Sequence, residues 1–339
     1  MRPPDPPIEL DLREVEADPA LRLVEEGLPA AAPERTWLRR HSKGVSVAFG
    51  VAVTAALVVG LYDKRDEFAE SLGAASVPVL AGAVALQIAW LIARSEAWYV
   101  CVVAAGGSTG RRPLYRAAAI GYLGNLLNSS FGLAVRITEL RRTAPAEAPK
   151  AGALVAAELP IVVIEIALAA ICSFTLVGPL GIPWWTPLIA LAVGFGFVAG
   201  LRRLAHRKRE GFWQGLAVMR ELAHRNRIVA LTVFAVSAQV LRNWLVLQGI
   251  GIDATIIDSV ALLVAAAAIG ILPVGPSLGV TSSVLILGSK GVAAVAAAGA
   301  LLTATGAVGA LCFAAWPLAD RLRRWRSRRR RESRSRIVH

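Results

Sequence analysis

The chain has 339 residues, of which 55% are hydrophobic and 18% are charged. Its mean hydropathy of +0.56 fits several apolar spans of the length that a bilayer requires and argues against a soluble fold. The formal net charge of +13 is concentrated between the apolar stretches and after the last one, a distribution that favours contact with anionic lipid head groups over nucleic acid.

The N-terminal residues 1–43 are rich in Pro, Glu and Arg and lack the apolar run and cleavage site of a secretory signal. We expect a disordered cytosolic arm there, then a membrane domain over residues 44–319 and a basic cytosolic tail over residues 320–339. The three cysteines lie in apolar surroundings without CxxC spacing, and the four histidines have no paired-ligand spacing. No metal or other cofactor is therefore expected.

Six apolar stretches are each near or above the roughly 17 to 25 residues that cross a bilayer. They are residues 45–62, 77–93 with a helical continuation to about 105, 151–176, 185–201, 228–247 and 292–318. The sequence therefore predicts an all-α, polytopic membrane protein with about six full spans.

Two further stretches, residues 114–140 and 255–288, each contain an apolar helix, a break and a second apolar helix. The breaks are polar or rich in Gly and Pro, at residues 124–132 (GNLLNSSFG) and 272–279 (LPVGPSLG). Irregular backbone is tolerated at membrane depth only where protein or a water-filled cavity covers it. We interpret both stretches as re-entrant helical hairpins that meet near the middle of the membrane.

The distribution of Lys and Arg predicts the orientation, because cytosolic loops carry the excess of positive charge. Lys64 and Arg65 are exceptions on the outside. Both termini become cytosolic if the stretch 255–288 is a hairpin, although two complete crossings there would do the same. The basic clusters assigned to the cytosol are residues 35–43, 111–116, 136–150 and 202–209, and the loops assigned to the outside are 177–183 and 249–254.

With this assignment, the order of span, span, hairpin and span occurs twice, with opposite orientations. Repeat one covers about residues 44–178 and repeat two about residues 183–319. Many transporters use such an inverted repeat to build a substrate site at the membrane midplane.

Charged residues within the spans are candidates for function, because an ionisable group at the bilayer centre is costly. Glu158 and Glu165 are seven residues apart and share a helical face, and Pro160 between them should kink the helix or free a carbonyl. Pairing of either carboxylate with Arg94 or Arg242 would line a polar groove. Alternatively, Arg94, Glu96 and Arg242 lie near an interface and snorkel. For Glu165 we favour the functional interpretation.

The first break offers hydrogen-bonding groups and a helix that begins near Phe131, whose free N–H groups suit a phosphate. Arg136 either reinforces the same anion or anchors the hairpin at the surface. The second break adds another helix start and exposed backbone. The candidate substrate-binding residues are Asn125, Asn128, Ser129, Ser130, Arg136, Glu158, Glu165, Arg242, Pro273, Pro276 and Ser277.

The segment 125–142 with G-x-x-x-R at Gly132 to Arg136, then Glu158, then LPVGPSLGV at 272–280, resembles the transmembrane region of the lysylphosphatidylglycerol synthases and their free-standing flippase-like relatives. The resemblance covers about residues 45–318. It departs from the family's usual glutamates and arginine at Leu133, Leu159 and Ser282.

This resemblance implies a multi-pass protein of the cytoplasmic inner membrane that translocates a phospholipid or a polyprenol-linked glycolipid. We expect no enzyme, because neither tail is long enough to supply a synthase domain. A flippase would have Asn128, Arg136, Glu158 and Glu165 along one connected cavity. A non-transporting scaffold or accessory subunit of a cell-envelope enzyme would have the groove filled by apolar side chains. The expected partners are membrane lipids, and the oligomeric state is left open.

Overall fold

The computed structural model describes residues 65–127, 129–207, 211–220, 222–270, 283–284, 286–287 and 291–337. Within these residues the secondary structure is helical, without strands, as the sequence predicts. The expected N-terminal arm, the predicted span 45–62 and the predicted second break at 272–279 lie outside the described residues.

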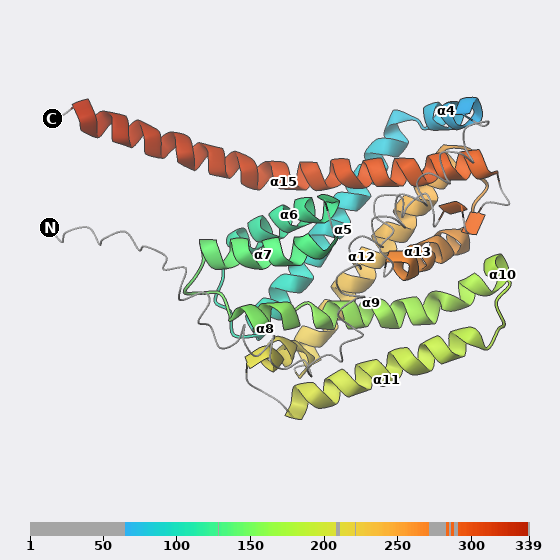
Figure 1. The fold of residues 1–339 in the computed structure, drawn as a ribbon, viewed down its shortest axis with the longest axis horizontal. Helices are drawn as coiled ribbons and strands as arrows, with labels where there is room; N and C mark the ends of the chain where they lie inside the picture. The colour runs from blue at the N-terminus through green and yellow to red at the C-terminus, as the bar shows by residue number, and fades with distance from the viewer. Residues whose placement is uncertain are drawn as a thin grey trace, which may run out of the picture. The chain divides into compact units, whose positions relative to one another are not determined.

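Helices follow one another with short connections (Figure 1). They are α4 (Arg65–Ala74), α5 (Val77–Ala104), α6 (Arg111–Leu127), α7 (Ser129–Thr143), α8 (Ala151–Ala156), α9 (Leu159–Cys172), the 3-10 helix η1 (Ser173–Leu176), α10 (Val177–Leu180), α11 (Thr186–Arg207), the 3-10 helix η2 (Gly211–Met219), α12 (Leu222–Gly249), α13 (Ile256–Gly270) and α15 (Val292–Ile337).

Five helical segments are long and apolar enough to cross a bilayer, at Val77–Ala104, Ala151–Leu176, Thr186–Arg207, His224–Gly249 and Val292–Pro317. They correspond to five of the six predicted spans, and the chain is therefore a multi-pass membrane protein. Hydropathy locates them well because a bilayer demands a minimum length of apolar helix wherever the chain crosses.

Helices α5 and α12 pack along each other and form the centre of the bundle (Figure 1). One apolar cluster joins α12, α13 and α15 through side chains such as Val246, Leu262 and Val295. A second cluster joins the C-terminal half of α5 to α6 and α7 around Trp98, which is fully buried. The second cluster positions the charged residues described below.

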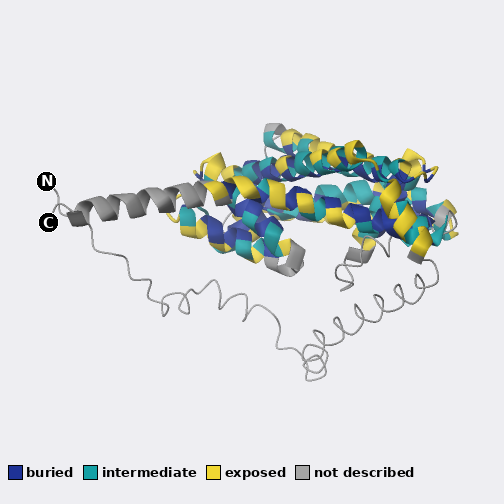
Figure 2. Cartoon of the chain, turned by 90° about the horizontal axis from the view of Figure 1, so that it is seen from above, coloured by how far each residue is buried: buried dark blue, intermediate teal, exposed yellow. Residues whose placement is uncertain are grey.

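Outward faces of the bundle carry large apolar side chains, and Figure 2 shows the exposed positions along the outer helices. Phe195 and Phe197 of α11 and Phe234 of α12 are each exposed by about half. Soluble proteins rarely expose contiguous apolar patches of this kind. Trp184 and Trp185 precede α11 and are also exposed, as suits side chains at a membrane interface.

The segment Ala151–Leu176 is interrupted at Ala157 and Glu158, between α8 and α9. Pro160 follows the interruption and has no N–H to donate, which is why a helix does not run through here unbroken. The Glu158 N–H bonds instead to the Val155 carbonyl at 3.2 Å. The interruption lies next to Pro160, and it places Glu158 at the junction of two helices. A bend of the helix axis there stays a prediction.

Helices α6 and α7 lie side by side (Figure 1), but the break between them is shorter than the predicted 124–132. Helix α6 continues to Leu127, and α7 begins at Ser129 rather than near Phe131. The glycines there serve close packing rather than interruption, because a Cβ on Gly132 would collide with the Asn125 side chain and the Gly121 carbonyl. Whether this pair of helices is re-entrant stays a prediction.

Candidate functional site

A cluster of four charged side chains joins α5, α7 and the junction of α8 and α9. Arg94 donates from Nη2 to Glu158 Oε1 at 3.0 Å and from Nη1 to Glu165 Oε1. Arg136 donates from Nη2 to the other oxygen of Glu158, Oε2. The predicted pairing of Glu158 and Glu165 with Arg94 is thus confirmed. With two guanidinium groups and two carboxylates, the cluster is formally neutral.

These ion pairs are more buried than surface pairs, and aromatic rings lie beside both arginines. The Arg136 residue is 6% exposed, and its guanidinium lies 4.1 Å from the centroid of the Trp98 ring. The Glu158 side chain is 14% exposed, whereas that of Glu165 is 30% exposed. Charge-assisted hydrogen bonds are roughly twice as strong as neutral ones, and a buried charge that loses its partner is costly.

A cavity of 170 Å³ opens beside this cluster, next to the contact of α6 with α7. Arg94, Tyr122, Asn125, Arg136 and Glu158 contribute its polar lining. The buried Nε of Arg136 has no hydrogen-bond partner within the described part of the chain. Since a buried donor without a partner costs about 1 to 3 kcal/mol, a ligand or water in this cavity would stabilise the site.

Glycines of α6 and α7 let the two helices pack closely beside the cavity. Gly121 and Gly132 line it, and a Cβ at Gly121 would lie 2.8 Å from both the Gly132 carbonyl oxygen and the Arg136 Cβ. The two helices can therefore approach closely enough to hold Arg136 above Trp98 and against Glu158.

The candidate residues from the sequence divide into three groups. Asn125, Arg136 and Glu158 line the cavity, and Glu165 joins them through Arg94. Arg242 lies at a different place. Four candidates lie outside the described residues, namely Asn128, Pro273, Pro276 and Ser277. The backbone of Ser129 and Ser130 belongs to α7, but their side chains are not among those described.

Arg242 of α12 is 6% exposed and is held by neutral acceptors. Its Nη1 donates to Gln87 Oε1 at 2.7 Å and to Gln239 Oε1 at 2.9 Å. Its Nη2 donates to Thr305 Oγ1 at 3.1 Å and to the Leu302 carbonyl. No carboxylate pairs with it among the described residues. Both earlier interpretations, pairing with Glu158 or Glu165 and snorkelling to an interface, are wrong for this residue.

Glu96 forms a separate ionic cluster near the surface. Arg111 and Arg227 donate to its Oε1 at 2.9 and 2.7 Å, and the Tyr115 hydroxyl donates to Oε2 at 3.0 Å. Both arginine side chains are largely exposed, which fits an interfacial position. Burial raises the pKa of the Tyr115 phenol, and its hydrogen bond to Glu96 raises that pKa further.

Sequence reasoning named Arg94 as a possible partner of the glutamates but not as a substrate-binding residue, and it gave Trp98 no role in the site. A signal was present, because Trp90, Arg94 and Trp98 recur every four residues and so share one face of α5. Arg94 lies 5.7 Å from the Trp90 ring centroid. No group of three His, Cys, Asp or Glu side chains in the described part of the chain is arranged to hold a metal ion.

Comparison with family models matches residues 47–315 to the transmembrane region of lysylphosphatidylglycerol synthase, and no synthase domain was detected with it. Comparisons with curated proteins and with solved structures found no match. The matched range contains the charged cluster, the cavity and the described candidate spans, except for the last two residues of Val292–Pro317.

Proposed function

This chain belongs to the family of the lysylphosphatidylglycerol synthase transmembrane region, and from that premise we propose that it translocates a phospholipid or a polyprenol-linked glycolipid across the cytoplasmic membrane. The observation that carries the proposal is a polar cavity, lined by two guanidinium groups, within a bundle of apolar helices. Both termini lie in the cytosol in this proposal, as the positive-inside rule favours.

The head-group phosphate would bind at Arg136. Among the described residues its Nε is buried without a hydrogen-bond partner, and its Nη2 donates to Glu158. Arginine suits phosphate because its planar fork can donate two parallel hydrogen bonds. Arg94 keeps Glu165 as a partner when the phosphate competes with Glu158 for Arg136. The lipid chains remain in the bilayer while the head group occupies the cavity.

Electroneutrality sets a condition on this step. The four charges of the cluster balance, so an entering phosphate adds an uncompensated negative charge in a low-dielectric site. A cationic group on the lipid head, or a proton on Glu158, supplies the compensation. Glu158 therefore has two roles in this proposal, as the resting partner of Arg136 and as the acceptor of the compensating positive charge.

An inverted repeat would provide the movement, by rocking of one repeat against the other. Helices α5 and α12 are the second spans of the two proposed repeats, and they pack along each other. Gln239 Nε2 of α12 donates to Gln87 Oε1 of α5 at 2.9 Å, so corresponding helices meet through the same residue type. This contact supports the repeat and supplies an axis for rocking.

Translocation of a fluorescent phospholipid in proteoliposomes tests the proposal. Glu158→Gln and Asn125→Ala change the cavity lining and should slow translocation about tenfold, as expected from a loss of about 1.4 kcal/mol in the rate-limiting step. Glu96→Gln is the matched control, because Glu96 also pairs with two arginines but lies outside the cavity. Wild-type rates in both cavity variants would remove this site from transport.

A non-transporting scaffold or accessory subunit is the second candidate. The observation in its favour is size, because the cavity of 170 Å³ is smaller than the roughly 300 to 1,000 Å³ of pockets that enclose small molecules. For this alternative, proteoliposomes with the wild-type protein would translocate lipid no faster than protein-free vesicles.

A further inference from the structure

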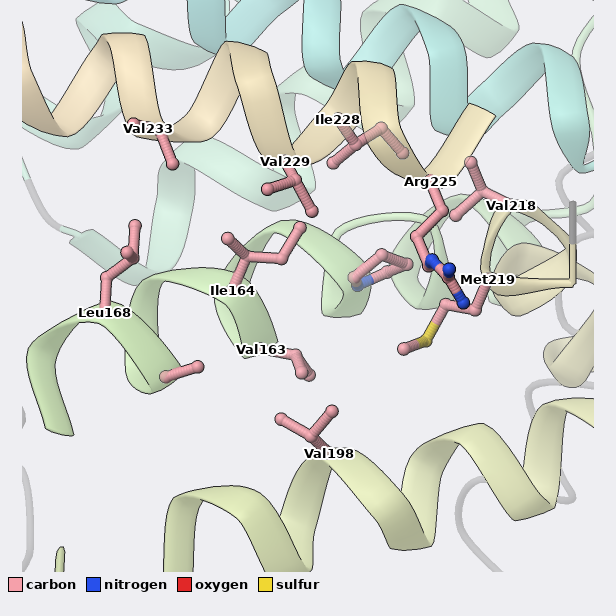
Figure 3. A pocket seen from close by; sticks show the side chains of 12 residues that line it. Val163, Ile164, Leu168, Val198, Val218, Met219, Arg225, Ile228, Val229 and Val233 are labelled. Carbon is pink, nitrogen blue, oxygen red and sulfur yellow. The ribbon is translucent and has the colours of Figure 1, made fainter. Parts of the chain in front are cut away.

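A second cavity, of 260 Å³, lies on the other side of α9 and is almost entirely apolar. It runs between α9, α11 and α12 and ends at η2 (Figure 3). Side chains such as Val163, Leu168, Val198 and Val233 form its walls. It shares no lining residue with the charged cavity, and we call it the lateral groove.

Arg225 is the one charged residue among those that line the lateral groove. Figure 3 shows its side chain extending from α12 to the end of the groove at Val218 and Met219, opposite the end at Leu168 and Val233. Within the described part of the chain, Arg225 forms no ion pair and no hydrogen bond. As far as the described residues show, the groove thus pairs an apolar channel with a cation at one end that has no counter-ion.

The surroundings place this cation at a membrane surface. Arg225 lies in the first turn of α12, just after η2, and α11 ends nearby with His206 and Arg207 in its last turn. Basic residues at the ends of spans attract anionic lipid head groups. Along α12, Arg225 and Val233 are about 12 Å apart, so the channel extends from the surface into the hydrocarbon region.

We propose that the lateral groove holds one acyl chain of an anionic diacyl phospholipid whose phosphate pairs with Arg225. This lipid is a resident of the groove, separate from the lipid proposed to cross at the charged cavity. Selectivity must come from the Arg225 pairing and from the shape of the groove, because an acyl chain gains little by leaving other lipid tails for an apolar protein surface. The inference does not depend on transport.

Native mass spectrometry of the full chain in detergent micelles tests this proposal, with dioleoylphosphatidic acid and dioleoylphosphatidylcholine as the probes. The wild type should retain one phosphatidic acid in preference to phosphatidylcholine. Arg225→Gln should weaken retention of phosphatidic acid about fivefold, the effect expected for one basic residue near the surface, without changing retention of phosphatidylcholine. Arg203→Gln is the control, because Arg203 is exposed on α11 and does not line the groove.

Filling the groove provides an independent test of where the chain lies. Ala167→Phe fills it from α9 and Val229→Phe from α12, and either should abolish retention of both lipids. Val229 is already 39% exposed, so its enlargement should leave the fold intact. Equal losses in Arg225→Gln and Arg203→Gln, or full retention in Val229→Phe with an unchanged thermal midpoint, would overturn the proposal.

Discussion

Substitution of Glu158 by Gln should destabilise the protein far more than the same change at Glu165. Glu158 is the only carboxylate paired with Arg136 and one of two paired with Arg94 among the described residues. In Glu158→Gln, Arg136 therefore stays buried at 6% exposure without a counter-ion. In Glu165→Gln, Arg94 keeps Glu158 as a partner.

The magnitude follows from the environment of each carboxylate. Removing one partner of a buried pair costs about 3 to 5 kcal/mol. The Trp98 ring, 4.1 Å from the Arg136 guanidinium, is present in both the wild type and the variant, so its cation–π contact does not change this cost. A loss of about 3 to 5 kcal/mol is expected for Glu158→Gln. For Glu165, whose side chain is 30% exposed, the loss should stay near 1 kcal/mol.

Equilibrium unfolding in mixed lipid and detergent micelles measures both losses. The double variant Glu158→Gln with Arg136→Gln removes the unpaired charge together with its partner, so its loss should fall short of the sum of the single losses by 0.5 to 3 kcal/mol, the range typical of residues in contact. Equal losses for Glu158→Gln and Glu165→Gln, or strict additivity in the double variant, would refute the assignment of Arg136 to Glu158.

Three further predictions concern packing, the second arginine and orientation. Gly132→Ala should destabilise the protein by about 1 to 3 kcal/mol in the same unfolding assay, because its Cβ meets the facing helix, whereas Gly178→Ala, with open space around it, should be neutral or stabilising. Arg242→Ala should cost at least about 2 kcal/mol, since it removes hydrogen bonds from a charged group, whereas an exposed arginine of α11 replaced by Ala should change stability by less than about 0.5 kcal/mol; equal effects would contradict the buried network. In a cysteine-free background, Glu147→Cys should react with an impermeant maleimide only from the cytosolic side and Pro183→Cys only from the outside, and the reverse pattern would invert the proposed topology.

Hydropathy alone located the described spans because the bilayer constrains each one locally. Pro160 likewise predicted an interruption from one residue's missing donor, which α8 and α9 confirm. The partners of the buried arginines were harder to predict. Arg94 and Arg242 are both arginines within long apolar helices, yet one pairs with two carboxylates and the other with two glutamines. That difference depends on which helices are neighbours, which a one-dimensional pattern does not contain.

The glycines between residues 121 and 132 illustrate a second limit. In the sequence, the Gly and Asn residues of this segment predict a helix break, yet α6 continues through Gly121 and Gly124 to Leu127. Their role became visible only with the facing helix in place, where Gly132 lies against Asn125 and Gly121. Neither the sequence nor propensity distinguishes a glycine that ends a helix from one that lets two helices touch.

Helix α15 is one continuous helix that joins the buried core of the bundle to the basic C-terminal segment. It has 46 residues, a length of about 70 Å, while its apolar part ends at Pro317 and the hydrocarbon slab is only about 30 Å thick. The helix also supplies the Leu302 carbonyl and the Thr305 hydroxyl that grip Arg242. A force applied by a binding partner at the C-terminal end of α15 would therefore act on the same helix that accepts the hydrogen bonds of the buried Arg242 guanidinium.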